Sequence, residues 1–289
     1  MRLISYNTPD GPRVAGMRDN QFIDLNHADP GVPACIKALL AQGPDGIRRA
    51  EAALAGGKPI PLAGLRPAPP IPQPEKIICV GLNYADHARE TGAKSPSEPI
   101  LFCKFSSAVC ADRQPIILPR LSREVDFEAE LVAVIGQGGR HIPRHEAMRH
   151  VGGYCCGNDV SARDWQIRKP GGQWLLGKSF DTFAPFGPAI FTADEIPQPQ
   201  NLKIQLRLNG QVMQKSSTAQ LIFPLDYLVS YVSDICTLAP GDLIFTGTPP
   251  GVGDGKKPPR FLKAGDTISL GVERLGQQAQ RVIAWTKGA

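Results

Sequence analysis

The stretch VDFEAELVAVIG, residues 125–136, joins a row of acids to a hydrophobic run. Asp126, Glu128 and Glu130 stand at every second position, and the apolar residues after them are typical of a strand inside a sheet. Alternate side chains of a strand share a face, so Glu128 and Glu130 point the same way, with Cα atoms roughly 7 Å apart. Two carboxylates in a buried strand would repel each other and lose hydration. A hard divalent cation such as Mg²⁺ or Mn²⁺, bound between them, would explain why both are present. The alternative is a solvated strand face, where acids are common.

Composition places the chain among ordinary globular proteins. Its 289 residues, 42% of them hydrophobic, suffice for one large domain and a smaller appendage. No apolar run approaches the roughly 20 residues that span a bilayer, and the start lacks the apolar core of a signal peptide, so we expect a cytoplasmic protein without membrane partners. The net charge of +5 is spread along the chain, which argues against nucleic-acid binding and suits an anionic small substrate.

The first part of the chain predicts a small α+β domain, residues 1–70, that includes a proline-rich linker. Short strand-like runs occur at residues 2–6, 13–17 and 21–25, and apolar residues recur at helical spacing from Ile36 to Leu54. The segment 58–74 is so rich in proline that it excludes both a helix and a central strand.

The second part, residues 71–289, predicts a β-rich domain. Strand-like runs alternate with Gly, Pro, Asn and Asp, and helical segments between them are few. LNGQ, residues 208–211, predicts a hairpin turn of the Asn-Gly type. The fold class expected from these patterns is α+β with a predominance of β-structure.

A third acidic ligand for the proposed cation would come from CCGNDVSARDWQ, residues 155–166. Asp159 ends an apolar strand just before an apparent helix, where a short carboxylate can be held rigidly and aimed into a cleft. Asp126 is the competing candidate, and we favour a structural role for it. Arg163 follows Asp159 by four residues, and we expect it near that carboxylate on the same helix.

Two further segments carry groups suited to catalysis or substrate binding. In NYADHARE, residues 83–90, His87 and Glu90 would share one helix face, so the carboxylate can orient the imidazole as a general base. The alternative is a surface or capping histidine. Lys178 is a candidate contact for an anion or enolate, and an ion pair with a neighbouring acid is its alternative. Thr248 lies in a Gly/Pro-rich loop that could bind a carboxylate or form a plain turn.

Taken in order, these segments resemble the fumarylacetoacetate hydrolase family over about residues 74–289. The segments that carry the resemblance are VGLNYADHARE, EPILFCKF, VDFEAELVAVIG, NDVSARDWQ, LLGKSFDTFAPFGPA, LNGQ, YLVSYVS and PGDLIFTGTPPGVG. The N-terminal part resembles that of two-part members. The family fold is a mixed β-sandwich roll, and its members usually form homodimers, so the resemblance implies both for this chain.

The resemblance also implies a role for each candidate residue. Glu128, Glu130 and Asp159 would bind Mg²⁺ (or Mn²⁺ or Ca²⁺), and His87 with Glu90 would form a dyad on a mobile lid. Lys178 and Gln166 would lie beside the metal, Arg163 would support Asp159, and Thr248 would hold the substrate carboxylate.

The activity expected first is hydrolytic C–C cleavage of a 2,4-diketo carboxylate, with pyruvate released through an enolate that the metal and Lys178 stabilise. His87 would deprotonate the attacking water. The alternative is an enol–keto tautomerase of oxaloacetate, or a decarboxylase, at the same site. A ureidoglycolate lyase and a non-catalytic metabolite-binding protein are less favoured, because every position of the site carries a chemically competent residue.

Overall fold

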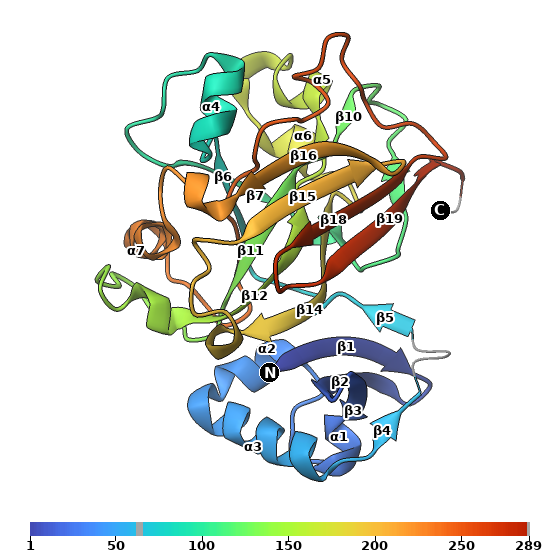
Figure 1. The fold of residues 1–289 in the computed structure, drawn as a ribbon, viewed down its shortest axis with the longest axis vertical. Helices are drawn as coiled ribbons and strands as arrows, with labels where there is room; N and C mark the ends of the chain where they lie inside the picture. The colour runs from blue at the N-terminus through green and yellow to red at the C-terminus, as the bar shows by residue number, and fades with distance from the viewer. Residues whose placement is uncertain (62–65, 288–289) are drawn as a thin grey trace.

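A computed structural model describes residues 1–61 and 66–287, and it is rich in β-structure (Figure 1). The larger sheet has the strand order β4-β3-β2-β1-β14-β12-β11-β17-β6-β7, with β5 beside β1 and β8 beside β14. A second sheet has the order β16-β15-β18-β19-β9, and β10 pairs with β13. These sheets confirm the predicted β-rich α+β class. Within the described ranges no helix is both long and apolar enough to cross a membrane.

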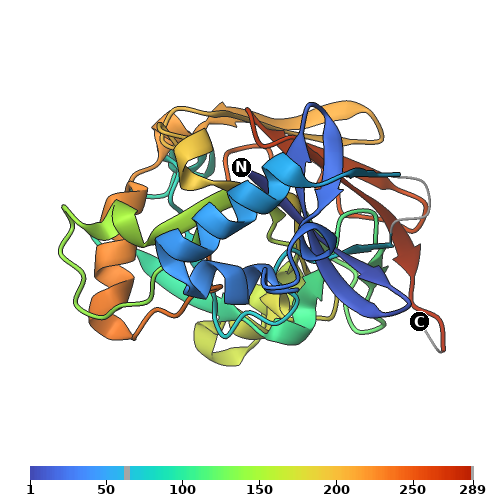
Figure 2. The ribbon, with the colours of Figure 1, turned by 90° about the horizontal axis from the view of Figure 1, so that it is seen from below.

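The N-terminal part contributes the antiparallel end of the larger sheet, and helices α1, α2 and α3 accompany it (Figures 1 and 2). Its elements are β1 (Arg2–Thr8), β2 (Gly11–Arg18), β3 (Gln21–Asp24), α1 (Leu25–Ala28), α2 (Ile36–Ala41), α3 (Gly43–Gly56), β4 (Pro59–Ile60) and β5 (Arg66–Ala68). The helical pattern expected from Ile36 to Leu54 is divided between α2 and α3. Gly43 has a φ of +59° and Pro44 stands in the first turn of α3, so the backbone turns and a new helix starts there.

The N-terminal strands extend the larger sheet, because β1 pairs with β14 through Arg2 opposite Phe191 and Leu3 opposite Ile190. The division into domains near residue 70 stays a prediction. Residues 62–65 of the proline-rich segment lie outside the described residues. Its described parts hold only the short strands β4 and β5, in keeping with the exclusion of a helix and a central strand.

The remaining elements form the β-rich part that carries the candidate site. In the larger sheet they are β6 (Ile77–Gly81), β7 (Ile100–Lys104), β8 (Val109–Cys110), β11 (Ala129–Ile135), β12 (Val151–Asn158), β14 (Ala184–Thr192) and β17 (Leu243–Phe245). The second sheet has β9 (Ile116–Leu118), β15 (Lys203–Leu208), β16 (Gln211–Ser217), β18 (Thr267–Val272) and β19 (Gln277–Ala284); the separate pair is β10 (Val125–Asp126) and β13 (Ser161–Ala162). The helices are α4 (Ala85–Thr91), α5 (Arg163–Gln166), α6 (Leu175–Lys178) and α7 (Leu225–Ile235), and the short 3₁₀ helices are η1 (Ser106–Ala108), η2 (Ala147–His150), η3 (Pro170–Gly172), η4 (Ala193–Glu195) and η5 (Thr218–Gln220).

The core lies between the two sheets, where β11 and β12 pack against β15 and β18. All seven residues of β11 are buried, and β15 alternates exposed or half-buried positions with buried ones, as a strand with one face on the core should. The predicted Asn-Gly hairpin joins β15 to β16: Asn209 and Gly210 have φ values of 52° and 80°, as a type I′ turn requires.

Candidate metal centre

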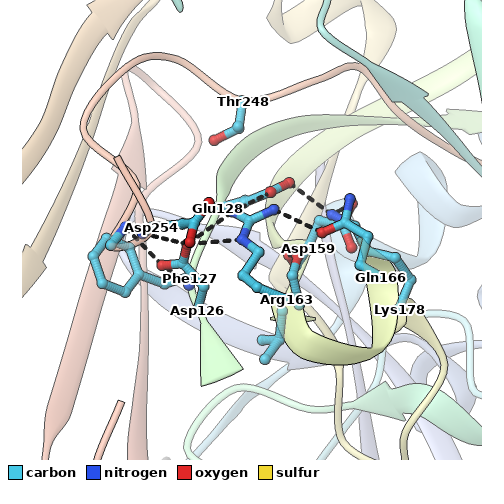
Figure 3. Close-up of polar contacts among 12 residues, drawn as sticks. Asp126, Phe127, Glu128, Asp159, Arg163, Gln166, Lys178, Thr248 and Asp254 are labelled. Carbon is cyan, nitrogen blue, oxygen red and sulfur yellow. Dashed lines mark hydrogen bonds and ion pairs between the residues drawn. The ribbon is translucent and has the colours of Figure 1, made fainter. Parts of the chain in front are cut away.

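Three buried carboxylates meet where β11 and β12 run side by side, and two of them, Glu128 and Asp159, are labelled in Figure 3. Ala129 lies opposite Asn158 in this pairing, and the Asp159 amide donates to the Glu128 carbonyl at 2.9 Å, which places Asp159 beside the two glutamates. One carboxylate oxygen from each of Glu128, Glu130 and Asp159 lies within 4.8 Å of the others. The structure thus brings together the three residues predicted as ligands, and hard oxygen donors so arranged could hold a divalent cation.

Two buried lysines face these carboxylates. The Lys178 ammonium, at the end of α6, donates to Glu128 Oε2 at 2.9 Å and to Asp159 Oδ2 at 2.8 Å. Lys104, at the end of β7, donates to Asp159 Oδ1 and to the Val160 carbonyl. Lys104 was not among the predicted site residues. Its place at the end of the apolar run ILFCK was a usable signal, because lysine is rarely buried without a partner.

Arg163 corrects one expectation, since it does not support Asp159. Its Nη2 lies 2.8 Å from Asp126 Oδ2 and 2.7 Å from Glu128 Oε1. The prediction that Arg163 and Asp159 share a helix is also wrong, because Asp159 precedes β13 and α5 begins only at Arg163. Asp126 is fully buried and accepts hydrogen bonds from Arg163 and from backbone amides, as expected of a structural acid.

Burial and neighbouring charges shift the pKa values of Glu128 and Glu130 in opposite directions. Burial alone would raise the pKa of Glu128, but Lys178 and Arg163 outweigh it and lower the pKa to about 2. The pKa of Glu130 is raised well above its usual range by burial first and then by the charges of Asp159 and Glu128. For Lys178, burial lowers the pKa, but Asp159 and Glu128 together raise it, so this side chain stays an ammonium ion. Without a metal ion, the raised pKa favours the protonated form of Glu130, and a bound cation would displace that proton.

The predicted dyad is present on α4. His87 Nδ1 lies 3.3 Å from Glu90 Oε2, and the same oxygen accepts a hydrogen bond of 3.0 Å from the Gly251 amide. The side chain of His87 is 13% exposed and that of Glu90 is 31% exposed, so solvent and small molecules can reach the pair. With Nδ1 directed to Glu90, the second ring nitrogen is available for proton transfer.

Gln166 and Thr248 are buried close to the same cluster (Figure 3). The Gln166 amide oxygen accepts from Arg163 at 2.9 Å, which fixes the orientation of the amide. The Thr248 hydroxyl donates to the Ala129 carbonyl at 3.0 Å and accepts from Gln214 at 2.8 Å. Its one proton is thus engaged, and a substrate carboxylate would have to replace Ala129 as its acceptor. The substrate-binding roles of Gln166, Arg163 and Thr248 stay predictions.

The family follows from a comparison with known sequences. The sequence model described as fumarylacetoacetate (FAA) hydrolase C-terminal matches residues 76–283, which include all of these site residues. The chain belongs to the fumarylacetoacetate hydrolase family. This confirms the resemblance inferred from the ordered motifs.

Relatives within the fumarylacetoacetate hydrolase family include both tautomerases and hydrolases. The chain is 46% identical over 288 residues to bovine (Bos taurus) oxaloacetate tautomerase FAHD2A, mitochondrial, covering 98% of this chain and 92% of the relative. Fumarylacetoacetate hydrolase from Exiguobacterium antarcticum has a TM-score of 0.88 at 33% identity, covering 99% of this chain and 100% of that one. Maleylpyruvate hydrolase from Sphingobium sp. SYK-6, in complex with manganese (II) ion and pyruvate, has a TM-score of 0.82 at 31% identity with the same coverage.

These comparisons correct the predicted location. The bovine tautomerase is named as a mitochondrial protein, which contradicts the expectation of a cytoplasmic one. That expectation was wrong because it relied on the absence of an apolar leader. Mitochondrial targeting segments are amphipathic and rich in arginine, so an apolar run is no test for them.

Proposed function

We propose that the protein is an enol–keto tautomerase of a 2-oxo dicarboxylate such as oxaloacetate. The observation that carries the proposal is the buried cluster of Glu128, Glu130 and Asp159, with Lys178 against it, together with the His87–Glu90 contact on α4. The extensive similarity to an oxaloacetate tautomerase favours this activity, which sequence analysis gave as the alternative, over the hydrolysis that it gave first.

The donor set fits a hard divalent cation. Three carboxylates can supply oxygen ligands to Mg²⁺, Mn²⁺ or Ca²⁺, and the raised pKa of Glu130 marks a carboxylate that the lysines leave without full compensation. A cation held there would act as a Lewis acid on the 2-oxo group and the adjacent carboxylate of the substrate. The manganese ion in the structure of maleylpyruvate hydrolase supports such a site.

The chain's own residues can move the proton. His87, held by Glu90, takes the proton from the C2 hydroxyl of the enol and returns one to C3, so the substrate keeps its composition. Lys178 remains an ammonium ion and donates to the oxygen on which negative charge develops. Gln166, oriented by Arg163, would contact the same end of the substrate.

Hydrolytic C–C cleavage is the second candidate, and the similarity to a maleylpyruvate hydrolase bound to pyruvate favours it. The same dyad could deprotonate a water that attacks a distal carbonyl of a 2,4-diketo acid. Both activities require a 2-oxo carboxylate beside the acidic cluster, and they differ in whether water reaches the substrate.

The test is an assay of the Mg²⁺-loaded and metal-free protein on freshly dissolved enol-oxaloacetate and on acylpyruvates. Enol absorbance and pyruvate release are followed separately, and the rates with Mg²⁺ alone are subtracted. Metal-dependent loss of the enol signal without pyruvate supports the tautomerase. Pyruvate from an acylpyruvate, with no acceleration of enol loss, would refute it in favour of the hydrolase.

The homodimer implied by the resemblance also stays a proposal. Light scattering of the purified protein at several concentrations gives its mass, and a mass of one chain throughout would contradict a stable dimer.

A further inference from the structure

Asp126 is a fully buried carboxylate that accepts hydrogen bonds from three separate segments of the chain (Figure 3). Arg163 binds it through Nε at 2.9 Å and Nη2 at 2.8 Å, and the Phe127 amide donates to it at 2.8 Å. The Gly253 and Asp254 amides of the loop after β17 donate to its two oxygens at 2.7 and 3.0 Å. The Asp126 side chain thus joins strand β10, the first residue of α5 and the loop after β17. Its two loop partners are 127 and 128 positions away in the sequence.

The same loop holds the dyad at its other end. The Gly251 amide donates to Glu90 Oε2, so residues 251–254 lie between the helix α4 and Asp126. The loop is closely packed: a Cβ on Gly251 would come 2.0 Å from the Met213 carbonyl, and one on Gly253 would come 2.1 Å from the Arg260 carbonyl. Such a segment transmits a displacement from one end to the other instead of absorbing it.

On its other side Asp126 reaches the acidic cluster. Arg163 Nη2 contacts both Asp126 Oδ2 and Glu128 Oε1, so the guanidinium links Asp126, which holds the loop, to a predicted metal ligand. A continuous series of contacts therefore runs from His87 through Glu90, the loop, Asp126 and Arg163 to Glu128.

We propose that Asp126 is a positioning residue that sets where the His87–Glu90 dyad lies relative to the metal carboxylates. It acts through the loop 251–254 on one side and through Arg163 on the other. The catalytic consequence rests on the proposed function, because proton transfer requires the base within hydrogen-bonding reach of the substrate.

Asp254 offers a way to weaken this link without changing a site residue, because its amide is one of the two loop amides that donate to Asp126. It follows Gly253 in a turn closed by the Lys256 amide and the Gly253 carbonyl, and proline is favoured at this second position of a turn. Asp254→Pro removes the N–H that donates to Asp126 and puts a ring carbon in its place. Asp254→Ala, the matched control, removes the same side chain and keeps the N–H.

The link predicts different outcomes for the two variants. Asp254→Pro should lower kcat for tautomerisation by about tenfold or more, since small misplacements of a catalytic group have effects of that order. Asp254→Ala should stay within about twofold of the starting protein, and calorimetry should give both variants the same Kd for Mn²⁺ within about twofold. Amide hydrogen exchange in α4 should become faster in Asp254→Pro alone. In a Glu90→Ala background, Asp254→Pro should cause no additional loss, because the link is already broken.

The proposal would be overturned if Asp254→Pro and Asp254→Ala had the same kcat and the same rate of amide exchange in α4. It would also be overturned if Asp254→Pro lowered kcat as much in the Glu90→Ala background as in the starting protein. If Asp254→Pro fails to fold, Asp126→Asn replaces it, because its amide group cannot accept on both sides, and unchanged α4 exchange there would equally overturn the link. A starting protein inactive on enol-oxaloacetate would refute the proposed function alone. Hydrogen exchange would then still decide whether Asp126 positions α4.

Discussion

Replacing Lys104 by methionine should weaken the fold and strengthen metal binding at the same time. Lys104 and its partner Asp159 both have fully buried side chains. Methionine matches the stem of lysine in length but lacks the charge, so the variant leaves the acidic cluster with one uncompensated negative charge. Breaking a buried ion pair by removing one partner costs about 3–5 kcal/mol. We expect the lower end of that range, because Lys178 still donates to the other oxygen of Asp159 at 2.8 Å.

The same missing charge should favour a cation. At an effective dielectric constant of about 20, two unit charges 4 Å apart interact by about 4 kcal/mol. Even if relaxation and hydration remove most of this, about 1.4 kcal/mol remains, which is a tenfold lower Kd for Mn²⁺. Bound metal should then restore more stability to the variant than it adds to the starting protein.

Urea unfolding with and without Mn²⁺, together with calorimetric titration, measures both effects. Lys76→Met is the matched control, because Lys76 pairs with the buried Asp242 at 2.8 Å and contacts none of the three predicted ligands. It should lose stability equally with and without Mn²⁺ and leave the Kd unchanged. If Lys104→Met bound Mn²⁺ no more tightly than the starting protein, the charge balance argued for the cluster would be refuted.

Three further predictions concern the dyad, the pH dependence of metal binding and the hairpin turn. His87→Ala should retain Mn²⁺ binding and lose about 10²–10⁴-fold in kcat, as removal of a general base does, and near-normal turnover in a clean preparation would contradict its role. Because the pKa of Glu130 is raised above 4.5, its proton adds stability to the metal-free fold that is fully present below pH 4.5 and lost as pH rises through the folded pKa. Metal binding must displace this proton, so the affinity for Mn²⁺ should rise with pH above 4.5. Calorimetry in buffers of different ionisation enthalpy should detect the released proton. The Glu130→Gln variant should release none. Gly210→Ala should destabilise the protein by about 1 kcal/mol in urea unfolding, because Gly210 has a φ of 80°, which strains a residue with a Cβ. The added Cβ would meet no neighbouring atom, so backbone strain is the only change. An unaltered unfolding midpoint would contradict the type I′ turn.

Local patterns sufficed for the parts of the molecule whose geometry depends on neighbours in the chain. Strand alternation alone placed Glu128 and Glu130 on one face, helical spacing placed His87 beside Glu90, and the Asn209–Gly210 pair indicated its turn. Where two local signals competed, the shorter-range one prevailed: the helical periodicity from Ile36 to Leu54 was continuous, yet the Gly-Pro pair at residues 43 and 44 divided the helix.

Tertiary structure alone decided which charges meet. Lys104 and Asp159 are 55 positions apart, and Arg163 and Asp126 are 37 apart, so no spacing rule within a helix or strand connects them. Arg163 stands four residues after Asp159, a spacing that suggested a shared helix, but the chain forms strand β13 between them and the guanidinium turns to Asp126 and Glu128. The face on which a residue lies within its own strand or helix is a local property of the backbone. Its charged partner depends on which strands and helices pack side by side. Because an unpaired buried charge costs free energy, each buried charge pairs with the opposite charge that this packing brings within reach.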